Sequence, residues 1–469
     1  QGCGNDYIYF NCFDQRIDYN TEDIWVSFDF SGRDLSGNII LTRNADDAVL
    51  AGSFSKYTHY VPFYRYCGSE NSGLMEGTWL AMRRTLTLGD TYFRNNKDRL
   101  GITSPEVTLR YGSKIRLYMP SSVVGNGVEG TGGYEGQEGY SLSSKRPFIV
   151  TMEIRDTVSN PLEREGTDVD DFCELNGGLQ IYSKGDDDTP ATEVPEDPED
   201  PEHPYSETSK RWVSACDSIP QVYVNVRYNP AEPGDQLSFP APYHVGYEPY
   251  VSEASVRDID MQIAEALKKR FHGEGDDYEK YEGVKTLEAD SVTLEGTAKI
   301  WYIGRFLDGF IFDTNIDEVK KIIYGEVAQT GTALEYTPSS GGMIQAFYYA
   351  IPNLKFGQWA ELITTSTNAY GSSGKSGSSS SSTSGSSGYS SSYLDYLNYL
   401  NYANSYYGSG GYYGGYYGGY YGSYYGGYYD SMYGSGYDSS STGTTVTTIT
   451  TEIPSFTPLI FQLYIEPED

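Results

Sequence analysis

The stretch KIWYIGRFLDGFIFDTN, residues 299–315, predicts two strands joined by a tight turn. Apolar and polar residues alternate in its first half, which is the period of a strand with one buried face. Asp308-Gly309 is a dipeptide typical of short hairpin turns, and Phe310-Ile311-Phe312 continues as the second strand. The stretch therefore predicts an antiparallel hairpin rich in aromatic residues.

Further motifs follow the hairpin in a fixed order. A short predicted helix comes after Gly341-Gly342, followed by a turn, a strand that leads to Ala369-Tyr370-Gly371, and a last strand near the C-terminal end. Together with Tyr302-Ile303-Gly304 and the Leu-Asp-Gly turn, this order resembles the FKBP-type peptidyl-prolyl cis-trans isomerases. The resemblance covers about residues 292–371 and 453–469, and several spaced motifs are more specific than a single match.

The resemblance implies an α+β fold, in which a curved antiparallel sheet surrounds a short helix as a half-barrel. It also implies an apolar pocket for a proline ring, with no cofactor and no metal. The backbone N–H of Ile344 and the hydroxyl of Tyr370 are expected to donate hydrogen bonds, and Asp313 to orient the aromatic wall. The expected pocket residues are Tyr302, Phe312, Asp313, Ile344, Phe347, Tyr370 and Phe461.

The sequence departs from the family pattern at the pocket floor. Phe347 replaces a Trp, Ala346 replaces a Gly, and Leu334 takes the place of a second wall aromatic. The segment at residues 315–334 is also longer than usual. Two interpretations therefore stay open: a working isomerase pocket, or aromatic residues that form only the core of a half-barrel.

Residues 22–156 resemble a second, worn copy of the same unit. IWVSFDFSGRDLSGNIIL, residues 24–41, repeats the strand, Leu-x-Gly turn and strand of the hairpin. Ile40-Leu41 stands where the later unit has Phe312-Asp313, and Val124 or Gly125 where it has Tyr370. We therefore expect this domain to be structural or partner-binding.

Composition excludes some functions. With a formal net charge of −32, from 33 Lys+Arg and 65 Asp+Glu, we expect no nucleic-acid partner, because binding to phosphates needs a basic stripe. No apolar run approaches the roughly eighteen residues of a membrane-spanning helix. Within residues 125–130, GNGVEG fits G-x-G-x-x-G, but no helical period follows it, so we expect a loop and no dinucleotide site.

The N-terminal segment 1–21 begins Gln1-Gly2-Cys3, which resembles the end of a bacterial lipoprotein signal. Lipidation of Cys3 would tether the protein to the cell envelope, and the alternative is a free or disulfide-bonded Cys3. Of the 5 cysteines, the remaining four would then form two disulfides in an exported chain. The local pairing is Cys12–Cys67 and Cys173–Cys216, although sequence does not assign it.

Two segments separate the predicted units. Residues 157–209, which include PEDPEDPEHP, predict an extended acidic linker. Within it, Asp168-Val169-Asp170-Asp171 predicts a solvated acidic loop, with a Ca²⁺ site as the alternative.

Residues 210–291 predict a bridge with one strand, QVYVNVRY, and one helix at 255–271 that begins with Ser255 and Asp258 as a capping box. We expect this helix to pack against the fold, with docking as the alternative.

The last predicted domain, residues 292–469, contains an insertion at 372–452. The insertion is rich in Ser, Gly and Tyr and far exceeds a normal loop. Tyrosine gives a large contact area at low entropic cost, so we expect this arm to grip a partner or client. The alternative is a solvated repeat without a partner.

Two functions from different classes follow. The first is a lipid-anchored FKBP-type prolyl isomerase and chaperone for proline-containing exported or outer-membrane polypeptides. The second is a non-catalytic FKBP-like accessory lipoprotein of an outer-membrane complex, docked through its Tyr/Gly-rich arm. A carbohydrate-binding role is a third, weaker hypothesis. The sequence fixes neither the membrane face nor the oligomeric state.

Overall fold

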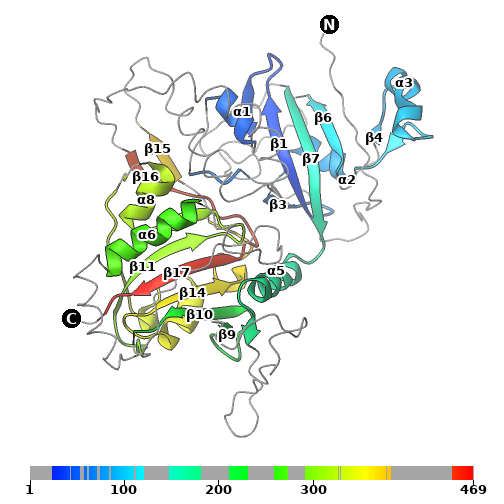
Figure 1. Ribbon diagram of the computed structural model, residues 1–469. Coiled ribbons are helices and arrows are strands. Elements are labelled where there is room, and N and C mark those ends of the chain that lie inside the picture. Colours follow the sequence, from blue (N-terminus) through cyan, green and yellow to red (C-terminus); the bar gives the residue numbers. More distant parts are fainter. Residues whose placement is uncertain are drawn as a thin grey trace, which may run out of the picture.

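The protein combines helices with antiparallel sheets. The computed structural model describes residues 24–120, 147–180, 211–230, 258–272, 291–381 and 446–467, with short gaps inside the first and fifth ranges. Two main sheets lie side by side, one built from strands within residues 25–158 and one from strands within residues 179–465 (Figure 1). We call them, with their helices, the first unit and the second unit.

The first unit is organised around β1 (Trp25–Arg33). β1 pairs along one side with β7 (Phe148–Val158), and β6 (Lys114–Met119) pairs with the far side of β7. The other side of β1 is shared by β2 (Ile39–Thr42) and β3 (Phe63–Tyr66). The remaining elements are α1 (Ala45–Leu50), α2 (Glu76–Arg83), β4 (Leu86–Thr87), α3 (Asp90–Leu100) and β5 (Glu106–Val107).

The second unit repeats this plan around β11 (Ala298–Arg305). β11 pairs along one side with β17 (Leu459–Ile465), which pairs with β14 (Trp359–Thr364). β12 (Ile311–Thr314) and β13 (Leu334–Tyr336) share its other side. The helices are α8 (Asp317–Tyr324) and α9 (Gln345–Ala350), with 3-10 turns η3 (Pro338–Ser340), η4 (Ile351–Asn353) and η5 (Ser366–Asn368).

Register and turn geometry show the internal repeat predicted from the sequence. Gly32 pairs with Leu41 in the first unit, and Gly304 pairs with Asp313 in the second. The turn at Asp34–Asn38 and the turn at Phe306–Phe310 make the same two backbone hydrogen bonds, and the glycine at the fourth position has φ +87° in one and +91° in the other. Six residues are identical at a constant offset: Gly32, Arg33, Leu35, Gly37, Ile39 and Thr42 match Gly304, Arg305, Leu307, Gly309, Ile311 and Thr314.

The predicted acidic linker is wrong over residues 157–180. β7 runs on to Val158, α5 (Pro161–Leu175) follows, and β8 (Leu179–Gln180) joins the second sheet. The acidic residues lie on α5, whose apolar positions Val169, Phe172 and Cys173 pack on the second sheet; the predicted acidic loop is therefore helical. Residues 181–209 lie outside the described part of the chain.

The predicted bridge belongs to the second sheet. β9 (Trp212–Ser214) and β10 (Val222–Tyr228) extend that sheet beyond β14, with β10 antiparallel to β14. The helix is α6 (Asp258–His272), and its Phe271 ring contacts the rings of Trp301, Trp359 and Tyr464. α6 therefore packs on the sheet, as expected. Ser255, the predicted capping residue, lies outside the described residues.

The predicted Cys173–Cys216 disulfide is wrong. Cys67, Cys173 and Cys216 are free thiols. Cys173 is enclosed in the apolar contact between α5 and the sheet, whereas Cys216 lies on the connection between β9 and β10. Cys67 is free as well, so the structure does not contain the Cys12–Cys67 pair. Cys3 and Cys12 themselves lie outside the described residues.

Among the described residues, no helix has the length and apolar character needed to cross a bilayer.

Helix α5 carries a buried acid, Glu165, that binds the second unit. Both oxygens of Glu165 accept hydrogen bonds from Ser366, one from its backbone N–H and one from its hydroxyl. Burial is the main reason that the pKa of Glu165 rises from 4.5 to about 7.

Thiol reactivity tests the cysteine assignment. Burial raises the pKa of Cys67 to about 12 and that of Cys173 well above its usual range, while a hydrogen bond to Ser218 lowers that of Cys216. Because the thiolate is the nucleophile, a maleimide should label Cys216 in the folded protein and leave Cys67 and Cys173 unlabelled until denaturant is added. Peptide mass mapping reads the result, and a Cys173–Cys216 cross-linked peptide would contradict it.

The pH dependence of stability tests the environment of Glu165. Its folded pKa, about 7, exceeds the unfolded value near 4.5, so its contribution is full below pH 4.5 and is lost as the pH rises to 7. At ~1.4 kcal/mol per pKa unit, Glu165→Gln should gain roughly 3 kcal/mol over the wild type between pH 4 and pH 8. Urea unfolding of both proteins measures this; a pH-independent difference would show that Glu165 has a normal pKa.

Candidate functional site

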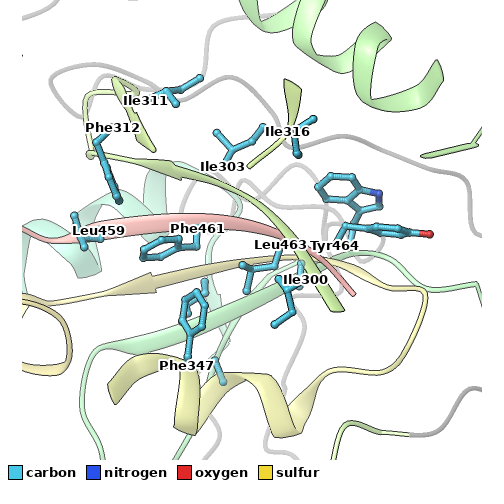
Figure 2. Packing of buried hydrophobic residues seen from close by; sticks show 14 of the residues in the cluster. Ile300, Ile303, Ile311, Phe312, Ile316, Phe347, Leu459, Phe461, Leu463 and Tyr464 are labelled. Carbon is cyan, nitrogen blue, oxygen red and sulfur yellow. The ribbon is translucent and has the colours of Figure 1, made fainter. Parts of the chain in front are cut away.

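Aromatic rings gather where α9 crosses one face of the second sheet. The Phe347 ring from α9 meets the Phe461 ring from β17 edge-to-face, with centroids 5.1 Å apart (Figure 2). Phe312 also meets Phe461 at a right angle, at 5.7 Å, and Tyr302 lies 6.2 Å from Phe461. Phe461 is therefore the centre of the cluster, and edge-to-face contacts of this kind hold rings in fixed orientations.

Gly304 makes room for one of these rings. A Cβ built on Gly304 would lie 2.6 Å from the Phe312 ring, closer than any real contact. The missing side chain thus lets Phe312 lie over β11 and reach Phe461. The identity of this residue therefore determines the shape of the aromatic cluster.

A polar pair lies beside the rings. The Tyr302 hydroxyl donates a hydrogen bond of 2.9 Å to Asp313, which is exposed. Burial, then the charge of Asp313 and the hydrogen bond to it, and then Tyr370, raise the pKa of Tyr302 well above its usual range. The hydroxyl therefore stays protonated near neutral pH and holds Asp313 at the edge of the cluster.

Asn315 fixes the middle of β11. β12 pairs with β11 at Ile303–Arg305 and β13 at Ala298–Ile300, which leaves a gap between the two ladders. The Asn315 side chain fills it: its oxygen accepts from the Tyr302 N–H at 2.8 Å, and its amide donates to Ile300 O at 3.0 Å. This residue thereby positions the backbone that carries Tyr302.

Two further expected residues approach from loops. Ile344 is the N-cap residue of α9 and is buried, and the preceding Met343 is 36% exposed. Tyr370 follows η5 and is close enough to Tyr302 to affect its pKa. The Lys375 ammonium lies 5.5 Å from the Tyr370 ring centroid, which is cation–π distance.

The structure brings all seven expected residues into one region. Four are joined by ring contacts, Asp313 by its hydrogen bond, Ile344 by its place at the start of α9, and Tyr370 by its proximity to Tyr302. The aromatic residue on β13 is Tyr336, which meets Phe347 at 5.7 Å, rather than Leu334. Asn315 and Tyr336 were missed, although the sequence Phe312-Asp313-Thr314-Asn315 showed a polar residue at the end of a strand.

The first unit lacks the same set of groups. The shared register places Phe30 at the position of Tyr302, Leu41 at that of Asp313, and Val150 at that of Phe461. Ile40 takes the place of Phe312, as the sequence suggested. These three positions of the first unit therefore carry no hydroxyl, no carboxylate and no central ring.

The first unit instead contacts the hairpin of the second. His59 lies 2.7 Å from a carboxylate oxygen of Asp308, and its ring stacks on Phe306 and Phe310 at 5.0 and 4.4 Å. Phe306 in turn lies 5.0 Å from the Phe312 ring. The aromatic cluster is thus continuous with the contact between the units.

Metal chemistry finds no support in the part of the chain that the structure describes. No group of three or more His, Cys, Asp or Glu side chains there has the arrangement needed to hold a metal ion. The Ca²⁺ alternative for residues 168–171 therefore has no ligand cluster. The region around Phe461 is apolar, with one tyrosine–aspartate pair and one loop tyrosine at its edge.

No family model and no curated protein matches the chain. Among solved structures, it is similar to the three FKBP domains of wheat FKBP73, with 9% identity and a TM-score of 0.20 over 98% of this chain and 91% of that one. A peptidyl-prolyl cis-trans isomerase from Pseudomonas syringae matches with 14% identity and a TM-score of 0.17, over 47% of this chain and 96% of that one. AtFKBP13 matches with 13% identity and a TM-score of 0.18, over 39% and 86%. These values are too low to assign the chain to a family.

Substitution of Gly304 tests the packing of the cluster. Gly304→Ala puts a methyl group into the Phe312 ring, so the free energy of unfolding should fall by about 1–3 kcal/mol. The control is Gly89→Ala, where nothing lies within 4 Å of the added Cβ and the change should stay below about 1 kcal/mol. Urea unfolding of both variants measures the difference, and equal effects would show that Phe312 does not depend on the glycine.

Proposed function

We propose that the second unit is an FKBP-type peptidyl-prolyl cis-trans isomerase that acts on proline-containing polypeptides. The observation that supports this most is the hydrogen bond from Tyr302 to Asp313 beside the rings of Phe312, Phe347 and Phe461. A structural core has no need of an exposed carboxylate fixed to a partly buried phenol at its edge. A pocket for a proline ring needs both an apolar floor and a fixed polar rim.

The reaction itself requires no nucleophile. Rotation about an X–Pro bond passes a twisted amide, and the barrier of about 18–20 kcal/mol comes from lost resonance. The uncatalysed step takes tens to hundreds of seconds. An apolar, water-poor pocket favours the twisted amide, because that state is less dipolar than the planar one, and a donor to the substrate carbonyl adds to the effect.

The described residues can divide these tasks. Phe347 and Phe461 provide the apolar surface for the proline ring, with Phe312 and Tyr302 as walls. Tyr370 is the candidate hydroxyl donor, and Ile344 the candidate backbone donor before the first turn of α9. Asp313, held by Tyr302, keeps the wall in place and orients the polar side of the site.

The cellular setting is part of the proposal. Cys3 would carry a lipid that holds the protein at the outer membrane, on its periplasmic or outer face. The clients would then be exported or outer-membrane polypeptides that fold slowly at X–Pro bonds. The strongly acidic chain, with a net charge of −32, fits polypeptide clients better than nucleic acid.

A non-catalytic role is the second candidate, and one observation favours it. Phe347 is fully buried, and only 6% of Phe312 and 4% of Phe461 are exposed, so these rings largely fill the space among themselves. In that case the protein is an accessory lipoprotein subunit of an outer-membrane complex. Its Tyr/Gly-rich arm, within residues 372–452, would be the docking segment; most of that arm lies outside the described residues.

A prolyl isomerisation assay on a series of X–Pro peptides distinguishes the two. We expect the full chain to accelerate isomerisation, and Asp313→Ala and Tyr370→Phe each to lower kcat/KM about ten-fold, because each removes an oriented hydrogen-bonding group. The full chain is needed because β8, β9, β10 and α5 complete the second sheet and its packing.

Matched controls are available in the same unit. Glu335→Ala removes an exposed carboxylate from the neighbouring strand β13, and Tyr348→Phe removes a hydroxyl from the exposed face of α9. Both should retain wild-type rates. A folded wild-type protein with only the uncatalysed rate on every peptide would rule out the enzyme and leave the accessory role.

A further inference from the structure

The turn that carries Tyr370 is held from outside the second unit's own sheet. Glu165 on α5 has 2% of its surface exposed, and it accepts hydrogen bonds from Ser366, 201 residues later in the chain. The bond from the Ser366 hydroxyl is 2.6 Å long. Ser366 is the first residue of η5, and Thr365 alone separates it from the end of β14.

Ser366 also closes the turn on its other side. Its carbonyl accepts the N–H of Ala369 at 2.9 Å and the N–H of Gly371 at 2.8 Å. These two residues flank Tyr370 in the chain. The N–H and hydroxyl of Ser366 bind Glu165, and its carbonyl binds both neighbours of Tyr370. Loss of the Glu165 hydrogen bonds would therefore free Ser366, the one residue that connects Glu165 to the backbone on either side of Tyr370.

The two hydrogen bonds from Ser366 favour the ionised form of Glu165, but burial outweighs them. Across the contact, η5 presents Ser366, and the residue before β10 that lies against Gly166 is Gln221; both are neutral. On α5 itself, Asp168 disfavours the ionised form, and Arg164 is engaged with Asp168 and Asp156. Asp170 binds Tyr223 and Gln221.

We propose that Glu165 is a positioning residue for Tyr370, and that the protonation of Glu165 sets how firmly α5 holds the turn that forms one rim of the pocket. The effect on catalysis rests on the isomerase function proposed above; the effect on the turn does not. Helix α5, which lies in a segment predicted as a linker, would then control the position of Tyr370.

The direction of the pH effect follows from burial. The pKa of Glu165 is raised to about 7, mainly by burial, so the protonated acid predominates below neutral pH. In that form one carboxyl oxygen still accepts the Ser366 N–H, and the carboxyl O–H donates to the Ser366 hydroxyl oxygen, so the contact keeps two hydrogen bonds. Above pH 7 the carboxylate is ionised in an apolar contact, which favours separation of α5 from the turn. The rim should therefore be firmest at mildly acidic pH.

NMR of the full chain tests the contact without reference to activity. We expect the backbone amide signals of Ser366 and Gly371 to shift with pH, with a midpoint near 7, and to lose this titration in Glu165→Gln. Gln can keep both hydrogen bonds and carries no charge, so this variant should fold. An Asp98→Asn variant on α3 is the control and should titrate as the wild type does.

A double-mutant cycle tests the link to Tyr370. Glu165→Ala should lower kcat about ten-fold in the wild-type background and have little effect in the Tyr370→Phe background, because the residue acts through that hydroxyl. Glu165→Gln should restore the rate and flatten its pH profile between 6 and 8.

The outcomes separate this proposal from the enzyme assignment. If no peptide is isomerised but Ser366 and Gly371 titrate only when Glu165 is present, the positioning role stands and the isomerase fails. If these amides do not titrate, or if Glu165→Ala is equally harmful with and without the Tyr370 hydroxyl, Glu165 has a purely structural role and the proposal is overturned.

Discussion

The aromatic cluster of the second unit depends on one absent side chain, that of Gly304. Because no Cβ projects from β11 at this point, Phe312 lies over the strand and meets Phe461, and Phe461 meets Phe347 from α9. The first unit keeps the equivalent glycine, Gly32, but the ring above it is Phe148, only 2.2 Å from a built Cβ. The same backbone device therefore supports a different aromatic ring in each copy.

The two units carry different side chains at the positions around this glycine. The second unit has the phenol, carboxylate and central ring, whereas the first has Phe30, Leu41 and Val150 at the same register positions. The first unit contributes His59, which contacts Asp308 and the rings that lead to Phe312. A duplication that leaves one copy with the polar groups and the other as a support is consistent with both proposed functions.

Local patterns predicted much of the fold and of the candidate site. The Asp308-Gly309 turn and the alternating strand β11 depend on nearby residues, and both appear in the structure. The repeat of Gly32-Arg33 as Gly304-Arg305 was visible because the two segments can be compared directly in the sequence. α5 was missed because its acidic residues concealed apolar positions at helical spacing, and Tyr336 because sequence could not fix which residue of β13 faces Phe347. The disulfide Cys173–Cys216 was wrong because cysteine parity says nothing about distance.

The central claim is that a proline ring binds against Phe347 and Phe461 in the second unit. Intermolecular NOEs between the full chain and a peptide with an isotope-labelled proline test it most directly. The account predicts contacts from the proline ring protons to the Phe461 ring and from the residue before proline to Ile344. Contacts confined to other residues, with the Phe347 and Phe461 signals unchanged at saturating peptide, would contradict it.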